Sequence, residues 1–141
     1  MDISIDFIID CFIKNFVLKE IRERSSLQLK SEKERKKFTD ILNHKWDTLL
    51  DMKYISKIPS GVSDYEFATK QLGVKNHELW YIISNHKEID GQITEFNVAF
   101  DKVYGRGFGS LIVNRSGDKL YLETEVVQGK PNRFIGKIAP I

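Results

Sequence analysis

The segment from Glu78 to Ser84 constrains the fold of this chain more than any other. It reads Glu-Leu-Trp-Tyr-Ile-Ile-Ser, so its centre is an unbroken run of large apolar side chains. Aromatic and β-branched residues favour strands, and a run without polar alternation is typical of a strand that is covered on both faces. We therefore expect this segment to lie at the centre of a β-sheet.

Three further strands are predicted towards the C-terminus. They cover residues 110–114, 119–127 and 133–138. Two polar, glycine-containing segments, 115–118 and 128–132, separate them and have the composition of turns. Such short connections between consecutive strands predict an antiparallel meander.

The middle strand of this meander alternates in polarity. Leu120 and Leu122 alternate with Tyr121, Glu123 and Glu125. Alternation of this kind is typical of a strand with one buried and one solvated face. We therefore expect Tyr121 and the two carboxylates to face solvent.

A capping-box pattern marks the start of a helix at Ser31. The Ser31 hydroxyl can accept a hydrogen bond from an exposed backbone N–H while Glu34 reaches back to the cap. Apolar side chains then follow at helical spacing, namely Phe38, Leu42, Trp46 and Leu49. These residues predict a helix that runs to about Asp51.

Two more helices are predicted further along the chain. Ser63 and Glu66 repeat the capping-box spacing, and Gly73 can end that helix in a left-handed conformation, so the helix spans about residues 64–72. The other helix begins near Thr94. Its apolar residues fall at i, i+3, i+4 and i+7, namely Phe96, Ala99, Phe100 and Val103.

The N-terminal segment fits both a helix and a strand. Apolar side chains recur at helical spacing from Ile5 to Phe16, but those of residues 3–13 also alternate with polar ones. We favour a helix over about residues 5–24, because the pattern continues for longer than a typical strand. On that helix a second apolar stripe lies away from the main one and consists of Phe7, Cys11 and Leu18. The stripe predicts either a second neighbour within the core or a contact with another chain.

Together these patterns predict one α+β domain over residues 1–141, with a helical N-terminal half packed on a C-terminal antiparallel sheet. The length is sufficient for one domain with its own hydrophobic core. The single cysteine, Cys11, cannot form an internal disulfide, which indicates a reducing, cytoplasmic compartment. The acidic N-terminus and the interrupted apolar stretch that follows predict neither an export signal nor a membrane span.

No motif in the sequence predicts a catalytic, cofactor or metal site. Residues 105–109 read Gly-Arg-Gly-Phe-Gly, but phosphate-binding loops follow a strand and open a helix, whereas this segment follows a predicted helix and opens a strand. We interpret it as a structural hinge into the sheet, with Arg106 as an exposed contact residue. His77 and His86 flank the central strand and are too far apart for a local metal motif.

Three classes of function remain open from these features. The first is a protein-binding inhibitor. The second is an RNA-binding protein that uses Arg106 and the basic run 33–37, although the net charge of +2 is too near balance to indicate a polyanion partner. The third is an enzyme with a general acid and base drawn from His77, His86, Glu88 and Asp90.

The organisation of the chain is similar to that of small bacterial immunity proteins of the contact-dependent growth-inhibition type. The shared profile comprises the capping boxes at 31–34 and 63–66, the helix 96–103, the glycine-rich segment 105–109 and the terminal meander. The resemblance implies a non-enzymatic cytoplasmic protein without a cofactor, whose protein partner is a toxin domain such as a nuclease. It would neutralise the toxin by occluding the active site. One departure is that inhibitors of basic nucleases tend to be acidic, whereas this chain is not.

On this hypothesis partner binding uses two segments of the meander half and one arginine. The predicted partner-binding residues are Tyr121, Glu123, Glu125, His86, Glu88, Asp90 and Arg106. The carboxylates would imitate the phosphates of a nuclease substrate, and the aromatic ring would anchor the partner.

Overall fold

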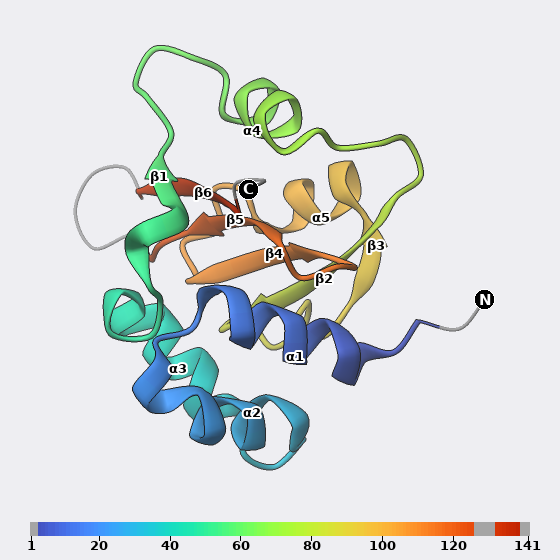
Figure 1. Cartoon of the computed structure of the whole chain (residues 1–141). Coiled ribbons are helices and arrows are strands. Elements are labelled where there is room, and N and C mark those ends of the chain that lie inside the picture. The colour runs from blue at the N-terminus through green and yellow to red at the C-terminus, as the bar shows by residue number, and fades with distance from the viewer. Residues whose placement is uncertain (1–2, 126–131, 139–141) are drawn as a thin grey trace.

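The computed structural model describes residues 3–125 and 132–138 and places a six-stranded antiparallel sheet at the centre of the chain (Figure 1). The strand order is β1-β6-β5-β4-β2-β3. The strands are β1 Ile55–Lys57, β2 Leu79–Ser84, β3 Ile93–Glu95, β4 Ser110–Asn114, β5 Lys119–Glu123 and β6 Arg133–Lys137. The helices are α1 Ile5–Phe16, α2 Arg22–Lys30, α3 Arg35–Lys45, α4 Asp64–Leu72 and α5 Phe96–Val103. The predicted α+β class is confirmed.

Helices cover both faces of this sheet, so the chain forms three layers. Figure 1 shows α1, α2 and α3 below the sheet and α4 and α5 above it. Within β2, Tyr81 and Ile83 belong to the core under α1–α3, whereas Trp80 and Ile82 belong to the core under α4 and α5. This alternation follows from the pleat of a strand. The prediction that β2 is buried on both faces is confirmed.

The first predicted helix is confirmed as a helix but ends earlier than expected. Ser4 caps α1, because its Oγ accepts a hydrogen bond from the N–H of Phe7 at 3.2 Å. The chain leaves the helix at Val17, which forms an antiparallel bridge with Leu50. Only after this bridge does α2 begin, at Arg22. The bridge joins residues that are far apart in the sequence, so a local pattern of apolar residues cannot predict it.

The capping-box prediction at Ser31 is only partly correct. Ser31 Oγ accepts a hydrogen bond from the N–H of Glu34 at 3.2 Å, but a turn intervenes and α3 starts only at Arg35. The helix ends at Lys45 rather than near Asp51, and a single 3₁₀ turn follows it. The α-helical pattern of apolar residues continues through this turn because it still faces the core.

The prediction for α4 is confirmed at both ends. Ser63 Oγ accepts a hydrogen bond from the N–H of Glu66 at 3.3 Å, and Gly73 ends the helix in a left-handed conformation with a φ of 61°. The helix predicted from Thr94 also exists, but its first residues form the short edge strand β3 and α5 itself starts at Phe96.

The meander prediction is confirmed in its topology and corrected in its exposure. The strands β4, β5 and β6 pair consecutively, but β5 ends at Glu123 and the remainder of the predicted strand, from residue 126, lies outside the described residues. The prediction that Tyr121 and Glu123 face solvent is wrong, because both are completely buried under the layer formed by α4 and α5. No helix within 3–125 or 132–138 has the length and apolar character that a bilayer crossing requires.

Candidate functional site

Most of the predicted partner-binding residues lie near one end of the sheet, where their side chains hold the fold together. Glu123 is the clearest case. Its Oε1 accepts hydrogen bonds from the Tyr121 hydroxyl and from Arg133 Nε, both at 2.9 Å, and its Oε2 accepts one from the N–H of Gly105 at 2.8 Å. Arg133 in turn donates to Asp64 Oδ2 at 3.3 Å. The carboxylate is therefore engaged on both oxygens inside the protein and is not presented to a partner.

The glycine-rich segment 105–109 needs its glycines for left-handed backbone conformations and for a close approach of α3. Gly105 and Gly107 have left-handed φ angles of 73° and 83°, and β4 begins three residues after Gly107. A Cβ added to Gly109 would lie 2.6 Å from the Cα of Asn43, so α3 can approach only a glycine there. The predicted hinge is confirmed. The anion that this segment holds is the protein's own Glu123.

Burial within this network makes the stability depend on pH. Burial raises the pKa of Tyr121, and the negative charge of Glu123 raises it further. The unfolded chain therefore loses this proton first, so the stabilisation is complete below about pH 10 and declines above it by about 1.4 kcal/mol per pH unit. Urea unfolding of wild type and Tyr121→Phe across this range should show a shallower alkaline decline for the variant. Parallel pH profiles would contradict this account.

The second predicted segment, from His86 to Asp90, also has a structural role. Asp90 accepts hydrogen bonds from Arg35 Nε at 2.5 Å and Nη2 at 2.9 Å, and from the N–H of Ser84 at 2.9 Å. Burial by itself lowers the pKa of Arg35, but the hydrogen bond that Arg35 donates to Asp90 helps to outweigh it, so the net pKa is raised. The His86 ring packs edge-on against Phe108 with centroids 4.6 Å apart.

The remaining predicted residues differ in their exposure. Glu125 is half-buried and accepts hydrogen bonds from Asn43 at 2.9 Å on Oε2, while its Oε1 contacts the His44 ring at 3.1 Å. Glu88 and Arg106 are exposed, as predicted. The Nη2 of Arg106 donates to a backbone oxygen of α5 at 3.3 Å. Glu88 and Arg106 are therefore the two exposed residues among the seven.

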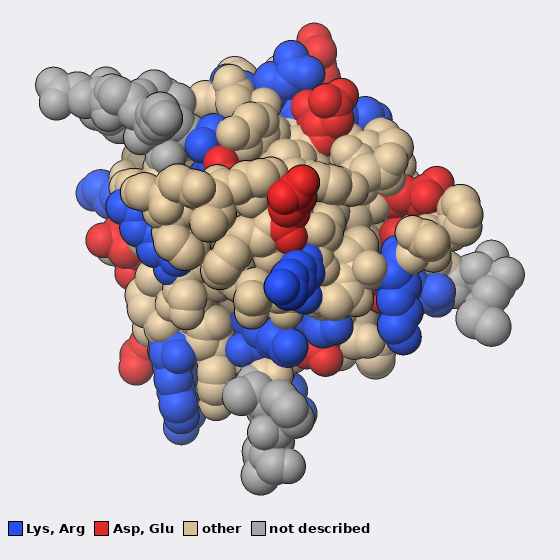
Figure 2. All heavy atoms as spheres, turned by 90° about the horizontal axis from the view of Figure 1, so that it is seen from above, with Lys and Arg blue, Asp and Glu red and all other residues tan. Residues whose placement is uncertain are grey.

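The basic run at the start of α3 is largely neutralised by the protein itself. Ion pairs of 2.5 to 2.8 Å join Lys30 to Asp10, Arg35 to Asp90, Lys36 to Asp40 and Lys37 to Glu34. The hydrogen bond from Lys36 is the largest cause of the lowered pKa of Asp40. Figure 2 shows positive and negative side chains interspersed on the face that carries α4. Within the run 33–37 only Lys33 has no ion pair among the described residues, so the start of α3 offers few unpaired cations to the phosphates of RNA.

The structure does not bring the candidate catalytic histidines together. His77 precedes β2 and His86 follows it, so a whole strand separates them. Within 3–125 and 132–138, no group of three or more His, Cys, Asp or Glu side chains is placed to hold a metal ion.

A different surface, around His77, has the properties of a binding site. The His77 side chain is 88% exposed, and its Nδ1 lies 3.1 Å from Glu95 Oε1. Across the described ranges His77 is the only non-glycine residue with a positive φ, at 64°. A left-handed conformation at such a residue costs on the order of 1 kcal/mol and is concentrated at functional sites.

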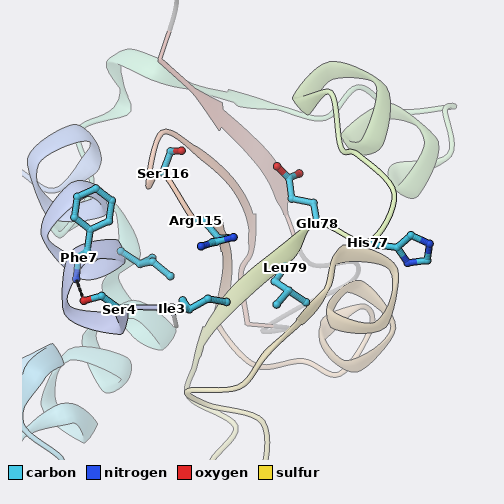
Figure 3. Close-up of a pocket in the computed structure, with 9 residues that line it drawn as sticks. Ile3, Ser4, Phe7, His77, Glu78, Leu79, Arg115 and Ser116 are labelled. Carbon is cyan, nitrogen blue, oxygen red and sulfur yellow. Dashed lines mark hydrogen bonds between the residues drawn. The ribbon is translucent and has the colours of Figure 1, made fainter. Parts of the chain in front are cut away.

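Two hollows flank His77. The larger, of about 500 Å³, lies between the first turn of α1, the start of β2 and the β4–β5 turn, and its walls include Phe7, Leu79 and Arg115 (Figure 3). The smaller, of about 330 Å³, includes Tyr65 and Phe96 in its walls. In Figure 3 the His77 ring points away from the larger hollow, so it stands between the two.

The larger hollow combines an exposed aromatic ring with an uncommitted cation. Phe7 is 59% exposed. Arg115 is exposed, and it forms no ion pair or hydrogen bond with any side chain or backbone group in the described ranges. Aromatic residues and arginine are the side chains that most often dominate the energy of protein interfaces. We call the residues Phe7, Tyr65, His77, Glu95 and Arg115 the His77 surface.

Close packing against α1 holds the backbone of the turn that carries Arg115. The β4–β5 turn contains Gly117, whose added Cβ would lie 2.5 Å from the Cβ of Cys11 and 2.6 Å from the backbone nitrogen of Phe12. Asn15 Nδ2 also donates to the carbonyl oxygen of Gly117 at 2.9 Å. The turn is thus fastened to α1, which lowers the entropy lost when a partner binds Arg115.

One sequence feature did point towards this surface. Phe7 belongs to the predicted second stripe of the first helix, for which another chain was one of the two expected neighbours. Cys11 of that stripe packs against Gly117, and Leu18 is half-buried. Cys11 and Leu18 of this stripe are therefore partly covered within the chain, whereas Phe7 is exposed. No sequence signal indicated Arg115 or the backbone conformation of His77.

The sequence matches no protein-family model, and neither curated proteins nor solved structures give a match. The residues of the His77 surface themselves therefore indicate what it can bind. It offers another molecule an aromatic ring, a guanidinium group, an imidazole and two hollows. This combination suits non-covalent contact with a protein.

Proposed function

We propose that this chain is a non-enzymatic protein-binding protein of the immunity type, which neutralises a bacterial toxin by binding it, and that the His77 surface makes the contact. The observation that carries the proposal is that one hollow has in its walls both the exposed Phe7 ring and Arg115, whose turn is fastened to α1. Aromatic residues and arginine are enriched in protein interfaces relative to the rest of the surface.

The proposed mode of binding differs from that expected from the resemblance alone. Glu123 and Asp90 are engaged inside the protein, so they are not available to imitate the phosphates of a nuclease substrate. The proposed contact is made by a ring and a cation. Whether the toxin's active site is occluded then depends on where on the toxin the His77 surface binds.

The test compares capture of a partner by matched surface variants. Tagged full-length chain is expressed in the cells that naturally produce it, as wild type, as Phe7→Ser/Arg115→Glu, and as the control Leu27→Ser/Arg106→Glu. The control removes an equally exposed apolar side chain, since Leu27 is 68% exposed, and reverses an exposed arginine elsewhere. Loss of interface residues of these types costs about 2 kcal/mol each, which corresponds to about 30-fold in affinity per residue.

We expect wild type and control to retain one partner at equal stoichiometry and the Phe7→Ser/Arg115→Glu variant to lose it. The captured partner, expressed alone, should arrest growth, and co-expression of the wild-type chain should restore it. Equal capture by both double variants would contradict the proposed surface. A captured partner whose expression is harmless would contradict the immunity function.

A further inference from the structure

We infer that the hollow beside Arg115 binds an acidic side chain of the partner, an aspartate or glutamate that neighbours an apolar residue in the same segment. This inference rests on the proposed function and specifies the chemistry of the partner. The hollow brings one guanidinium group next to the apolar side chains of Ile3, Phe7 and Leu79. Figure 3 shows Arg115 between α1 and the start of β2, where it can meet a side chain that enters the hollow.

The charge of Arg115 is not used within the described part of the chain. Glu78 is the one acidic residue among the residues that line the hollow. Its Oε1 already accepts hydrogen bonds from Trp80 Nε1 at 3.1 Å and from the N–H of Lys75 at 3.4 Å. Neither oxygen of Glu78 forms an ion pair or hydrogen bond with Arg115, so within the described residues the guanidinium keeps its donors for an external acceptor.

The geometry of the guanidinium selects the acceptor. Its parallel N–H groups match the two oxygens of a carboxylate, and such charge-assisted pairs are roughly twice as strong as neutral hydrogen bonds. Phosphate groups on proteins are usually bound by clusters of arginines, whereas this hollow has one. Carboxyl termini are usually captured by backbone N–H nests. A single arginine beside apolar side chains, in a hollow that also has polar walls, therefore favours an acidic side chain.

The apolar walls specify the neighbour of that carboxylate. Phe7 leaves most of its ring uncovered, and Leu79 is partly exposed at the start of β2. An apolar residue next to the acidic one would cover both side chains while the carboxylate pairs with Arg115.

The test uses small probes and the full-length, ¹⁵N-labelled chain. Acetyl-Asp-Phe-amide carries the proposed pair of side chains, and acetyl-Asn-Phe-amide is its neutral isostere. Acetyl-Gly-Phe with a free carboxyl terminus and inorganic phosphate represent the other anion sources. Amide chemical shifts are followed during each titration for wild type, Arg115→Gln and the control Arg106→Gln.

We expect acetyl-Asp-Phe-amide to shift the amides of residues 4–8, 79 and 115–116 with an affinity about tenfold above that of the asparagine probe. Arg115→Gln should remove this difference and Arg106→Gln should keep it. Equal binding of both peptides, stronger binding of phosphate or of the free carboxyl terminus, or no shift in the hollow would overturn the inference. None of these outcomes contradicts the proposed function, which has its own capture test. In that test, contacts made by Phe7 alone are sufficient to retain the partner.

Discussion

Replacing Gly117 with alanine is expected to destabilise the chain by about 3 kcal/mol, because two costs combine at this position. The φ of Gly117 is 66°, a left-handed conformation that alanine adopts only with strain. In addition, the new methyl group would lie 2.5 Å from the Cβ of Cys11 and 2.6 Å from the backbone nitrogen of Phe12. Either α1 or the β4–β5 turn must move, and urea unfolding measures the loss.

The matched control is Gly61→Ala. Gly61 also has a left-handed φ, 85°, but no atom lies within 4 Å of an added Cβ. The free energy of unfolding of this variant should fall only by the cost of the left-handed backbone conformation, about 1 to 2 kcal/mol. Equal losses for the two variants would show that the turn is not packed against α1. In that case the turn that carries Arg115 would not be preorganised for binding.

Replacing Glu123 with alanine is expected to destabilise the chain by about 3 to 5 kcal/mol, the usual cost of removing one member of a buried ion pair. Glu123 is fully buried, and the Arg133 side chain is only 12% exposed. Without the carboxylate, Arg133 Nε, the Tyr121 hydroxyl and the Gly105 N–H all lose an acceptor. Chemical denaturation of the purified variant checks the value.

Two comparisons separate this effect from a general loss of packing. Glu125→Ala, two residues further along, removes a carboxylate that is 24% exposed and lies beside an exposed histidine, and should cost less than about 1 kcal/mol. The double variant Glu123→Leu/Arg133→Leu should be more stable than Glu123→Leu alone, because it also removes the buried guanidinium that has lost its main partner. Asp64 then loses Arg133 as well, but it is 20% exposed and keeps the hydrogen bond from the Tyr104 hydroxyl. A loss for Glu125→Ala as large as that for Glu123→Ala would contradict the assigned role of the network.

Local patterns predicted the elements that local interactions determine. Ser63 caps the start of α4 through a hydrogen bond to a residue three positions away, and the left-handed backbone of Gly73 ends the helix. The unbroken apolar run of β2 likewise reflects burial on both faces. By contrast, the end of α1 depends on the bridge between Val17 and Leu50, a contact between distant segments. The three-residue strands β1 and β3 are too short to show any alternation.

The candidate site was predicted less well than the fold, for a physical reason. The alternation in β5 placed Glu123 on the polar face, but the pattern could not reveal that Arg133 and Asp64 form a buried network above it. A polar side chain on a strand is equally compatible with solvent and with an internal partner. The exposure of Phe7 and the isolation of Arg115 depend on how α1 meets the β4–β5 turn, which only the tertiary structure shows.

The most direct test of the His77 surface is hydrogen–deuterium exchange of the chain alone and in complex with its captured partner. We expect the complex to protect backbone amides in residues 3–8, 75–79, 94–97 and 115–116, which border the two hollows. Segments 85–88 and 105–108, at the opposite end of the sheet, should exchange as in the free chain. Protection confined to 85–88 and 105–108, with none around His77, would contradict the proposed surface and return the contact to the residues first predicted from the sequence.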